Sequence, residues 1–234
     1  MSSFKLLNSK EHKDLRVSMQ YFPDLGYDVG ATSVLPSEII AVQREYPILF
    51  RKNDETGAFL PVALLGFEAK ENVFIDADGE WQADYIPASM VRGPFLIGVD
   101  EDKNTAVYID MDDPRVGVEE GDLLFNDDDK PTEAMDRVSA ALSMLHHEQN
   151  DMKAMVDAFL EADLIETVSL KMQFNDGNDF NFAGAYTIDV EKIGGLDPEA
   201  LAKLNKSGYL GLAYFIAGSI GNVQKLIDFK NLSL

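Results

Sequence analysis

Four side chains in the first half of the sequence have the chemistry of a ligand-binding site: Arg16, Trp81, Tyr85 and Arg92. An arginine guanidinium pairs with a carboxylate through two parallel hydrogen bonds, and a flat aromatic ring packs well against a flat ligand. Arginines are scarce in this chain, which has 20 basic residues against 41 acidic ones. We therefore predict that these four residues bind a ligand in a shared concave pocket. Two simpler interpretations stay open: the arginines neutralise neighbouring acids, and Trp81 anchors the core.

A serine between small residues, in the segment Ala217-Gly218-Ser219-Ile220-Gly221, is a variant of the nucleophile elbow of serine hydrolases. That elbow requires a strand before the serine, a helix after it and a histidine later in the chain. Here the preceding segment is predicted to be helical, and the last histidine is His147. We therefore exclude a serine hydrolase. The chain has no cysteine, which also excludes thiol nucleophiles, disulfides and thiolate zinc sites.

Metal binding has weak support in the sequence. The histidines are His12, His146 and His147, and the adjacent pair diverges by about 100° on a helix. The acidic runs lack the ligand spacing of calcium-binding loops, and Asp76-Ala77-Asp78-Gly79 is better explained as a turn. No glycine-rich phosphate-binding loop follows a predicted strand. We therefore predict no metal site and no cofactor, and the sequence identifies no catalytic residue.

The charge of the chain limits the classes of partner. The formal net charge is −21, and residues 100–129 alone hold 12 acidic and two basic side chains. Nucleic-acid binding and docking to an anionic membrane both need basic surfaces, so both are excluded. The longest apolar-rich stretch, at residues 209–220, is too short to span a bilayer. We expect a soluble cytoplasmic protein, or one that reaches the cell surface without a signal peptide. A protein, peptide or small-molecule partner is expected, and a monomer is favoured over a dimer.

The first half of the chain predicts short antiparallel strands separated by turns. A short helix is expected from Ser37 to Glu45, ended by Pro47. The predicted strands span residues 48–50, 61–67, 73–75, 95–99 and 105–111, with turns at 53–57, 76–79 and 100–104.

The second half changes to a helical period. Apolar residues spaced by three and four predict one unbroken helix over 132–163, packed on the body of its own chain. A hairpin with its turn at 175–178 follows, then helices from Asp197 to Gly208 and over 209–229. The predicted fold class is α+β. We expect one domain over residues 1–234, β-rich over 1–130, with the long helix, the hairpin and the last helices over 131–234.

Short motifs from about residue 4 to residue 229 form an ordered set. They are His12-Lys13-Asp14-Leu15-Arg16-Val17, Tyr46-Pro47-Ile48-Leu49-Phe50, Pro61-Val62-Ala63-Leu64-Leu65-Gly66, Asn72-Val73-Phe74-Ile75-Asp76 with Gly79-x-Trp81, Tyr85-Ile86-Pro87-Ala88, Pro94-Phe95, Leu124-Phe125, Pro131-Thr132 and the strand from Gly184 to Asp189. Together they resemble the SapC family of bacterial proteins.

The resemblance implies an association with a bacterial surface layer or with outer-membrane uptake receptors, and it carries no catalytic residue. We therefore expect a non-catalytic accessory or binding protein of such a system, with an unknown ligand. Two alternatives stay open. One is an enzyme of unrecognised type that acts on a peptide or an amino-acid derivative, and the other is a structural component of the surface layer.

Overall fold

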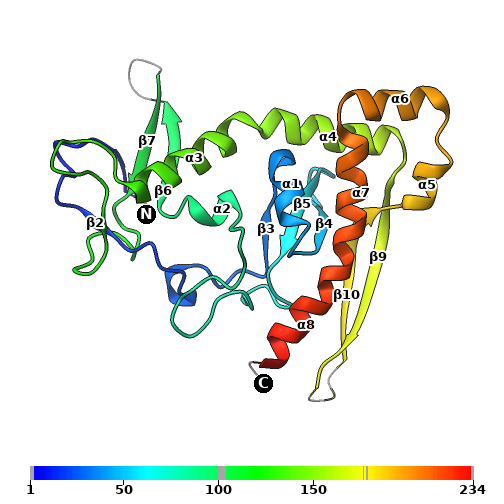
Figure 1. The fold of residues 1–234 in the computed structure, drawn as a ribbon, viewed down its shortest axis with the longest axis horizontal. Helices are drawn as coiled ribbons and strands as arrows, with labels where there is room; N and C mark the ends of the chain where they lie inside the picture. The colour runs from blue at the N-terminus through cyan, green and yellow to red at the C-terminus, as the bar shows by residue number, and fades with distance from the viewer. Residues whose placement is uncertain (1–2, 100–103, 176, 178, 233–234) are drawn as a thin grey trace.

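The computed structural model of the chain describes residues 3–99, 104–175, 177 and 179–232. Helices and antiparallel strands form an α+β fold, as predicted (Figure 1). The turns predicted at 100–104 and 175–178 lie partly outside the described residues, at Asp100, Glu101, Asp102 and Lys103 and at Asp176 and Asn178. Two sheets, each with its own hydrophobic cluster, organise the molecule.

The larger sheet has five strands and draws on both halves of the chain. Its order is β3 (Ala31–Ser33), β5 (Phe59–Leu64), β4 (Ile48–Lys52), β10 (Asp179–Ile188) and β9 (Ile165–Gln173). All neighbouring strands are antiparallel, and β10 joins the late hairpin to the early one through the pair Tyr186 and Phe50. The β9–β10 hairpin confirms the prediction from alternating apolar residues. The strands β4 and β5 confirm the predictions from the apolar runs at 48–50 and 61–67, although β5 ends at Leu64 and not at residue 67.

Helices from the end of the chain pack against this sheet. Figure 1 shows α7 (Tyr209–Ser219) and α8 (Val223–Leu232) crossing in front of it. The single helix expected over 209–229 is interrupted by a 3-10 turn at Ile220–Asn222. Before it, α5 (Val190–Gly194) leads to α6 (Pro198–Lys206), which Asp197 caps as predicted by accepting from the amides of Glu199 and Ala200.

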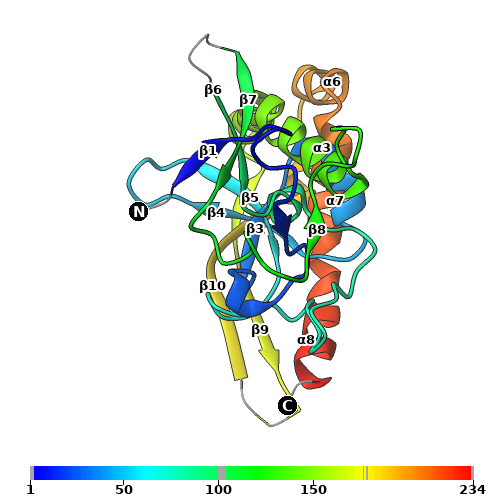
Figure 2. The same cartoon turned by 90° about the vertical axis from the view of Figure 1, so that its left-hand side faces the viewer.

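The smaller sheet has the order β1 (Phe4–Leu6), β7 (Thr105–Asp110) and β6 (Phe95–Val99), so the predicted 95–111 hairpin is confirmed (Figure 2). Beside it, β2 (Arg16–Val17) pairs with β8 (Asp122–Leu123). The second hydrophobic cluster lies under this sheet and includes Phe95 and Ile109, both fully buried.

The long helix expected over 132–163 is two helices, α3 (Glu133–His147) and α4 (Gln149–Glu161). Glu148 separates them with φ −92° and ψ 4°, outside the helical region, although no glycine or proline is present. Its carboxylate accepts hydrogen bonds from the amide and the hydroxyl of Ser37, at 3.1 and 2.6 Å. The two helices still run end to end and do not fold back into a hairpin (Figure 1).

Two smaller expectations were wrong. The helix expected over 37–45 is reduced to a 3-10 turn at Pro36–Glu38 followed by the single helical turn α1 (Ile39–Val42). The strand expected over 73–75 is one isolated bridge between Ile75 and Trp81. The remaining short elements are a 3-10 turn at Pro23–Leu25 and the helical turn α2 (Ala88–Val91).

Candidate functional site

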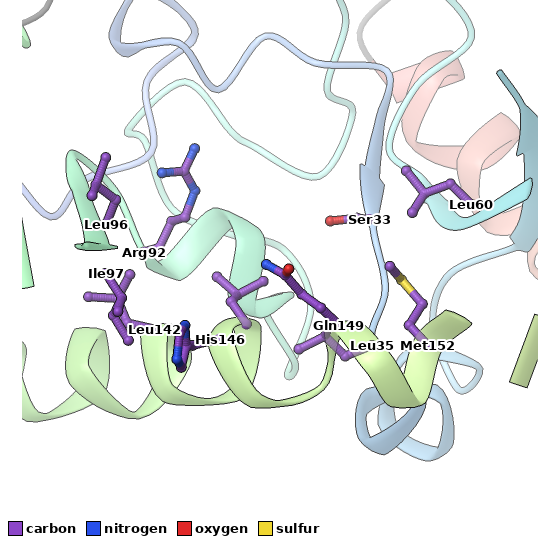
Figure 3. A pocket seen from close by; sticks show the side chains of 11 residues that line it. Ser33, Leu35, Leu60, Arg92, Leu96, Ile97, Leu142, His146, Gln149 and Met152 are labelled. Atoms are coloured by element: carbon purple, nitrogen blue, oxygen red, sulfur yellow. The ribbon is translucent and has the colours of Figure 1, made fainter. Parts of the chain in front are cut away.

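A groove of about 550 Å³ lies between the two sheets, with α3 and α4 along one wall (Figure 3). Ser33 and Leu60 of the five-stranded sheet line one end, and Leu96 and Ile97 of β6 line the other. The lining is mostly aliphatic. We refer to this feature as the inter-sheet groove.

The inter-sheet groove touches the last strand of each sheet, because β3 and β6 are terminal strands. Successive side chains of a strand point to opposite faces, so a cavity that contacts both Leu96 and Ile97 lies at the edge of β6. A terminal strand presents backbone N–H and C=O groups that its own sheet does not use. Part of these edges is already used within the chain, because the Ser33 carbonyl accepts from the Ser89 hydroxyl and the Phe95 carbonyl accepts from Arg92. The groove therefore combines apolar side chains with the remaining main-chain groups of the two edges.

The helical wall of the groove comes from the middle of the apolar stripe that predicted the long helix. The α3 end of the stripe is buried in the cluster of the smaller sheet, and the α4 end is buried in the cluster of the five-stranded sheet, which we call the main cluster. Between them Leu145 and Met152 are half-buried, and His146 and Gln149 are exposed. The stripe thus connects two cores and leaves its middle open to the groove.

A buried carboxylate holds the segment beside this wall. Glu38 is only 1% exposed and accepts from the Leu35 amide, the Ala88 amide and the Tyr85 hydroxyl, at 3.0, 2.7 and 2.9 Å. Burial raises the pKa of Glu38, the three hydrogen bonds oppose that rise, and nearby Glu148 adds to it. Glu38 therefore ties Leu35, which lines the groove, to the start of α2.

Arg92, a predicted ligand-binding residue, lines the inter-sheet groove. It follows α2, its side chain is exposed, and its Nη1 donates to the Phe95 carbonyl at 3.1 Å. Among the residues that the structure describes, no carboxylate lies within 4.0 Å of this guanidinium. The guanidinium is accordingly available to a carboxylate from outside.

Trp81 and Tyr85 lie apart from the inter-sheet groove and are linked to each other through Tyr46. The indole Nε1 of Trp81 donates to the Tyr46 hydroxyl at 2.6 Å, and that hydroxyl donates to the Tyr85 carbonyl at 2.6 Å. Trp81 lines a second, smaller pocket and packs against the main cluster. The predicted turn before it is confirmed: Asp76 accepts from the amides of Asp78 and Glu80.

Arg16 lines neither pocket. It lies on β2, exposed, and its Nη1 donates to the Gly121 carbonyl at 2.7 Å. The structure therefore does not bring the four predicted residues into one pocket.

The residues of the helical wall could not be predicted as groove residues, because an apolar stripe has the same period whether it faces a core or a groove. The polar Gln149 inside that stripe was the one sequence signal of a solvent-facing stretch.

Ser219 has a structural role. It is fully buried in α7, donates to the Ile216 carbonyl at 2.6 Å and accepts from the Ile48 amide at 2.8 Å. This geometry agrees with the exclusion of a nucleophile elbow. Within the described ranges, no three histidine, aspartate or glutamate side chains are grouped to hold a metal ion, and no helix there is long and apolar enough to cross a membrane.

Comparison with known proteins identifies a family but no individual relative. No curated protein and no solved structure matches the chain. The model of the family described as SapC matches residues 7–226 of the 234-residue chain. The chain therefore belongs to the SapC family.

Proposed function

We propose that the protein is a binding protein that holds an extended, apolar peptide segment of a partner in the inter-sheet groove. The observation that carries the proposal is the position of the groove, at the edges of β3 and β6 with the helical wall between them. Peptides that add a strand to a sheet edge gain affinity from main-chain hydrogen bonds and specificity from pockets for alternate side chains. The aliphatic side chains Leu60, Leu96 and Met152 line the groove and would contact the apolar side chains of such a peptide.

The charge of the groove distinguishes it from the rest of the molecule. The chain carries a net charge of −21, yet the charged side chain in the lining is Arg92, accompanied by the imidazole of His146. A peptide with an acidic residue or a free carboxylate at one end would pair with Arg92. We propose this polarity as the basis for choosing among peptides.

The resemblance described above suggests the class of partner. We propose that the bound segment belongs to a partner protein of the bacterial surface layer or of an outer-membrane uptake system. The SapC-family chain would then be a non-catalytic accessory of that partner. The proposed role depends on the groove alone and requires no cofactor. Peptide binding and the identity of the partner are separate claims and need separate experiments.

The peptide claim is tested by selecting displayed random decapeptides on the wild-type protein and measuring the affinity of one selected peptide. Gln149→Trp should weaken its binding at least tenfold, because the exposed Gln149 lines the groove and an indole would fill it. Asn150→Trp is the matched control, since Asn150 is the next residue, is exposed and does not line the groove. Circular dichroism verifies that both variants fold.

Two further readouts locate the bound peptide. Amide exchange of β6 and β3 should slow when the peptide binds, because strand addition protects edge amides. Arg92→Gln should weaken the binding of a peptide that ends in a carboxylate more than it weakens the binding of the same peptide with an amidated end. If the Gln149→Trp protein binds as tightly as the wild type, or if no selected peptide binds below about 100 µM, peptide binding in the groove is wrong.

A further inference from the structure

The second pocket has a volume of about 270 Å³ and shares no lining residue with the inter-sheet groove. Val91 of α2 lines this pocket, whereas Arg92, the next residue, lines the groove. We call it the aromatic pocket, because Tyr21, Tyr27 and Trp81 form its walls. The proposed function uses none of its residues.

The three rings form one rigid wall. Tyr21 meets Tyr27 edge-to-face with the ring centroids 4.9 Å apart, and it meets Trp81 in the same way at 5.2 Å. The hydrogen bond from Trp81 to Tyr46 fixes the indole plane. Gly79 lines the same pocket with a φ of +77°, and a Cβ there would lie 2.7 Å from the ring of Phe22, the residue after Tyr21. The wall is therefore preorganised for a flat ligand.

Arg137 of α3 supplies the positive charge of the aromatic pocket. Its side chain is exposed, and no carboxylate among the described residues lies within 4.0 Å of it. Arg115, which contacts the Tyr27 ring, differs from Arg137 because a carboxylate already binds it. It lies 5.0 Å from the centroid of the Tyr27 ring and is held by Asp113 through hydrogen bonds of 2.7 and 2.6 Å. Of these two arginines, Arg137 is the one that an external carboxylate can reach.

Polar groups around Tyr21 complete the pocket. Burial first, and then neighbouring Tyr27, raise the pKa of Tyr21 to about 12, so its hydroxyl stays protonated at neutral pH and can donate. Arg137 opposes this rise in pKa and Glu80 adds to it, which places one positive and one negative charge near the hydroxyl. Glu80 also lines the pocket, and it would repel a ligand with two negative charges.

We propose that the aromatic pocket binds a small monocarboxylate that carries one aromatic ring, with its carboxylate on Arg137 and its ring against Trp81 and Tyr21. The volume is at the small end of ligand sites, which limits the ligand to one ring and a short chain. The aromatic wall selects the ring, Arg137 selects the negative charge, and Glu80 repels anions, most strongly those with a second negative charge.

The test uses 3-phenylpropionate as the probe. Trp81 is the only tryptophan, so its emission excited at 295 nm reports directly on this pocket, and calorimetry gives the stoichiometry. We expect one saturable site with a Kd of about 1 mM or tighter. The neutral analogue 3-phenyl-1-propanol should bind at least tenfold more weakly. Glu80→Gln should strengthen binding of the carboxylate severalfold.

Arg137→Gln should weaken the binding of 3-phenylpropionate at least tenfold. The variant should then bind 3-phenylpropionate no more tightly than 3-phenyl-1-propanol. Arg51→Gln is the matched control, because Arg51 is exposed on β4 and does not line the aromatic pocket. The absence of a saturable wild-type response, binding by the Arg137→Gln protein as tight as that of the wild type, or equal weakening by Arg137→Gln and Arg51→Gln would overturn the proposal.

Discussion

The carboxylate of Glu148 accepts two hydrogen bonds from Ser37, a residue 111 positions earlier in the chain, one from its amide and one from its hydroxyl. This contact lies at the junction of α3 and α4 and ties that junction to the 3-10 turn before α1. The junction is also where the helical wall of the inter-sheet groove passes from one core to the other.

Glu148→Ala should destabilise the protein by about 1–2 kcal/mol, because the Ser37 amide and hydroxyl lose their acceptor. Ser37→Ala removes the hydroxyl alone and should cost less. In a double-mutant cycle measured by urea unfolding, the two changes should couple by about 0.5–1.5 kcal/mol. Additive effects would show that the contact contributes nothing to stability.

The stability that Glu38 contributes should fall as the pH rises. Its pKa in the folded protein lies above its ordinary value of 4.5, mainly because burial penalises the charged form. The contribution is therefore fully present below pH 4.5 and is lost as the pH rises through the raised pKa. The free energy of unfolding of the wild type minus that of Glu38→Gln should decrease from pH 5 to pH 7. Exposed Glu55→Gln is the control, and a difference that stays flat or rises contradicts this assignment.

Tyr46→Phe should cost about 1–3 kcal/mol of unfolding free energy, because the Trp81 indole N–H loses its acceptor and the Tyr85 carbonyl loses its donor. The emission spectrum of Trp81 should change in the same variant. Tyr214→Phe removes a hydroxyl from a ring that is 48% exposed and should change neither quantity. Equal effects of the two substitutions would argue against the hydrogen-bonded link.

Ser219→Ala should destabilise the protein by about 1–3 kcal/mol, because the buried Ile48 amide is left without its acceptor. Exposed Ser143→Ala on α3 should change stability by less than about 0.5 kcal/mol. A fluorophosphonate probe should not label Ser219 of the wild-type protein, because this side chain is fully buried. Labelling of Ser219 in the wild type would restore the hydrolase interpretation.

The elements with a clear local period could be predicted from the sequence. Alternating residues identified the β9–β10 hairpin, and Asp197 before Pro198 identified the start of α6. The break at Glu148 could not be predicted, because no glycine or proline marks it and Ser37, the residue that Glu148 contacts there, lies 111 positions away in the sequence. The strand expected over 73–75 failed for a related reason: apolar residues that contact a core need not pair with a neighbouring strand.

The candidate site could be predicted only in part. Arg92 and Trp81 each line a pocket, but the pockets are different ones, and residue type alone does not tell which side chains converge. Arg137 was missed because one exposed arginine on a helix has no distinguishing sequence pattern. Leu145 belongs to the helix that was expected to pack on the body of the chain, yet it is half-buried and lines the groove.

The helix pair that spans both sheets also determines how the molecule loses its structure. Met135, Val138 and Leu142 of α3 belong to one hydrophobic cluster, whereas Met155, Val156 and Phe159 of α4 belong to the other. If either cluster unfolded alone, one helix of the α3–α4 pair would lose its packing while the other stayed packed. Apolar surface at the junction of the two helices would then be exposed to water. The two sheets should therefore denature as one cooperative unit, with a single calorimetric transition for the whole chain.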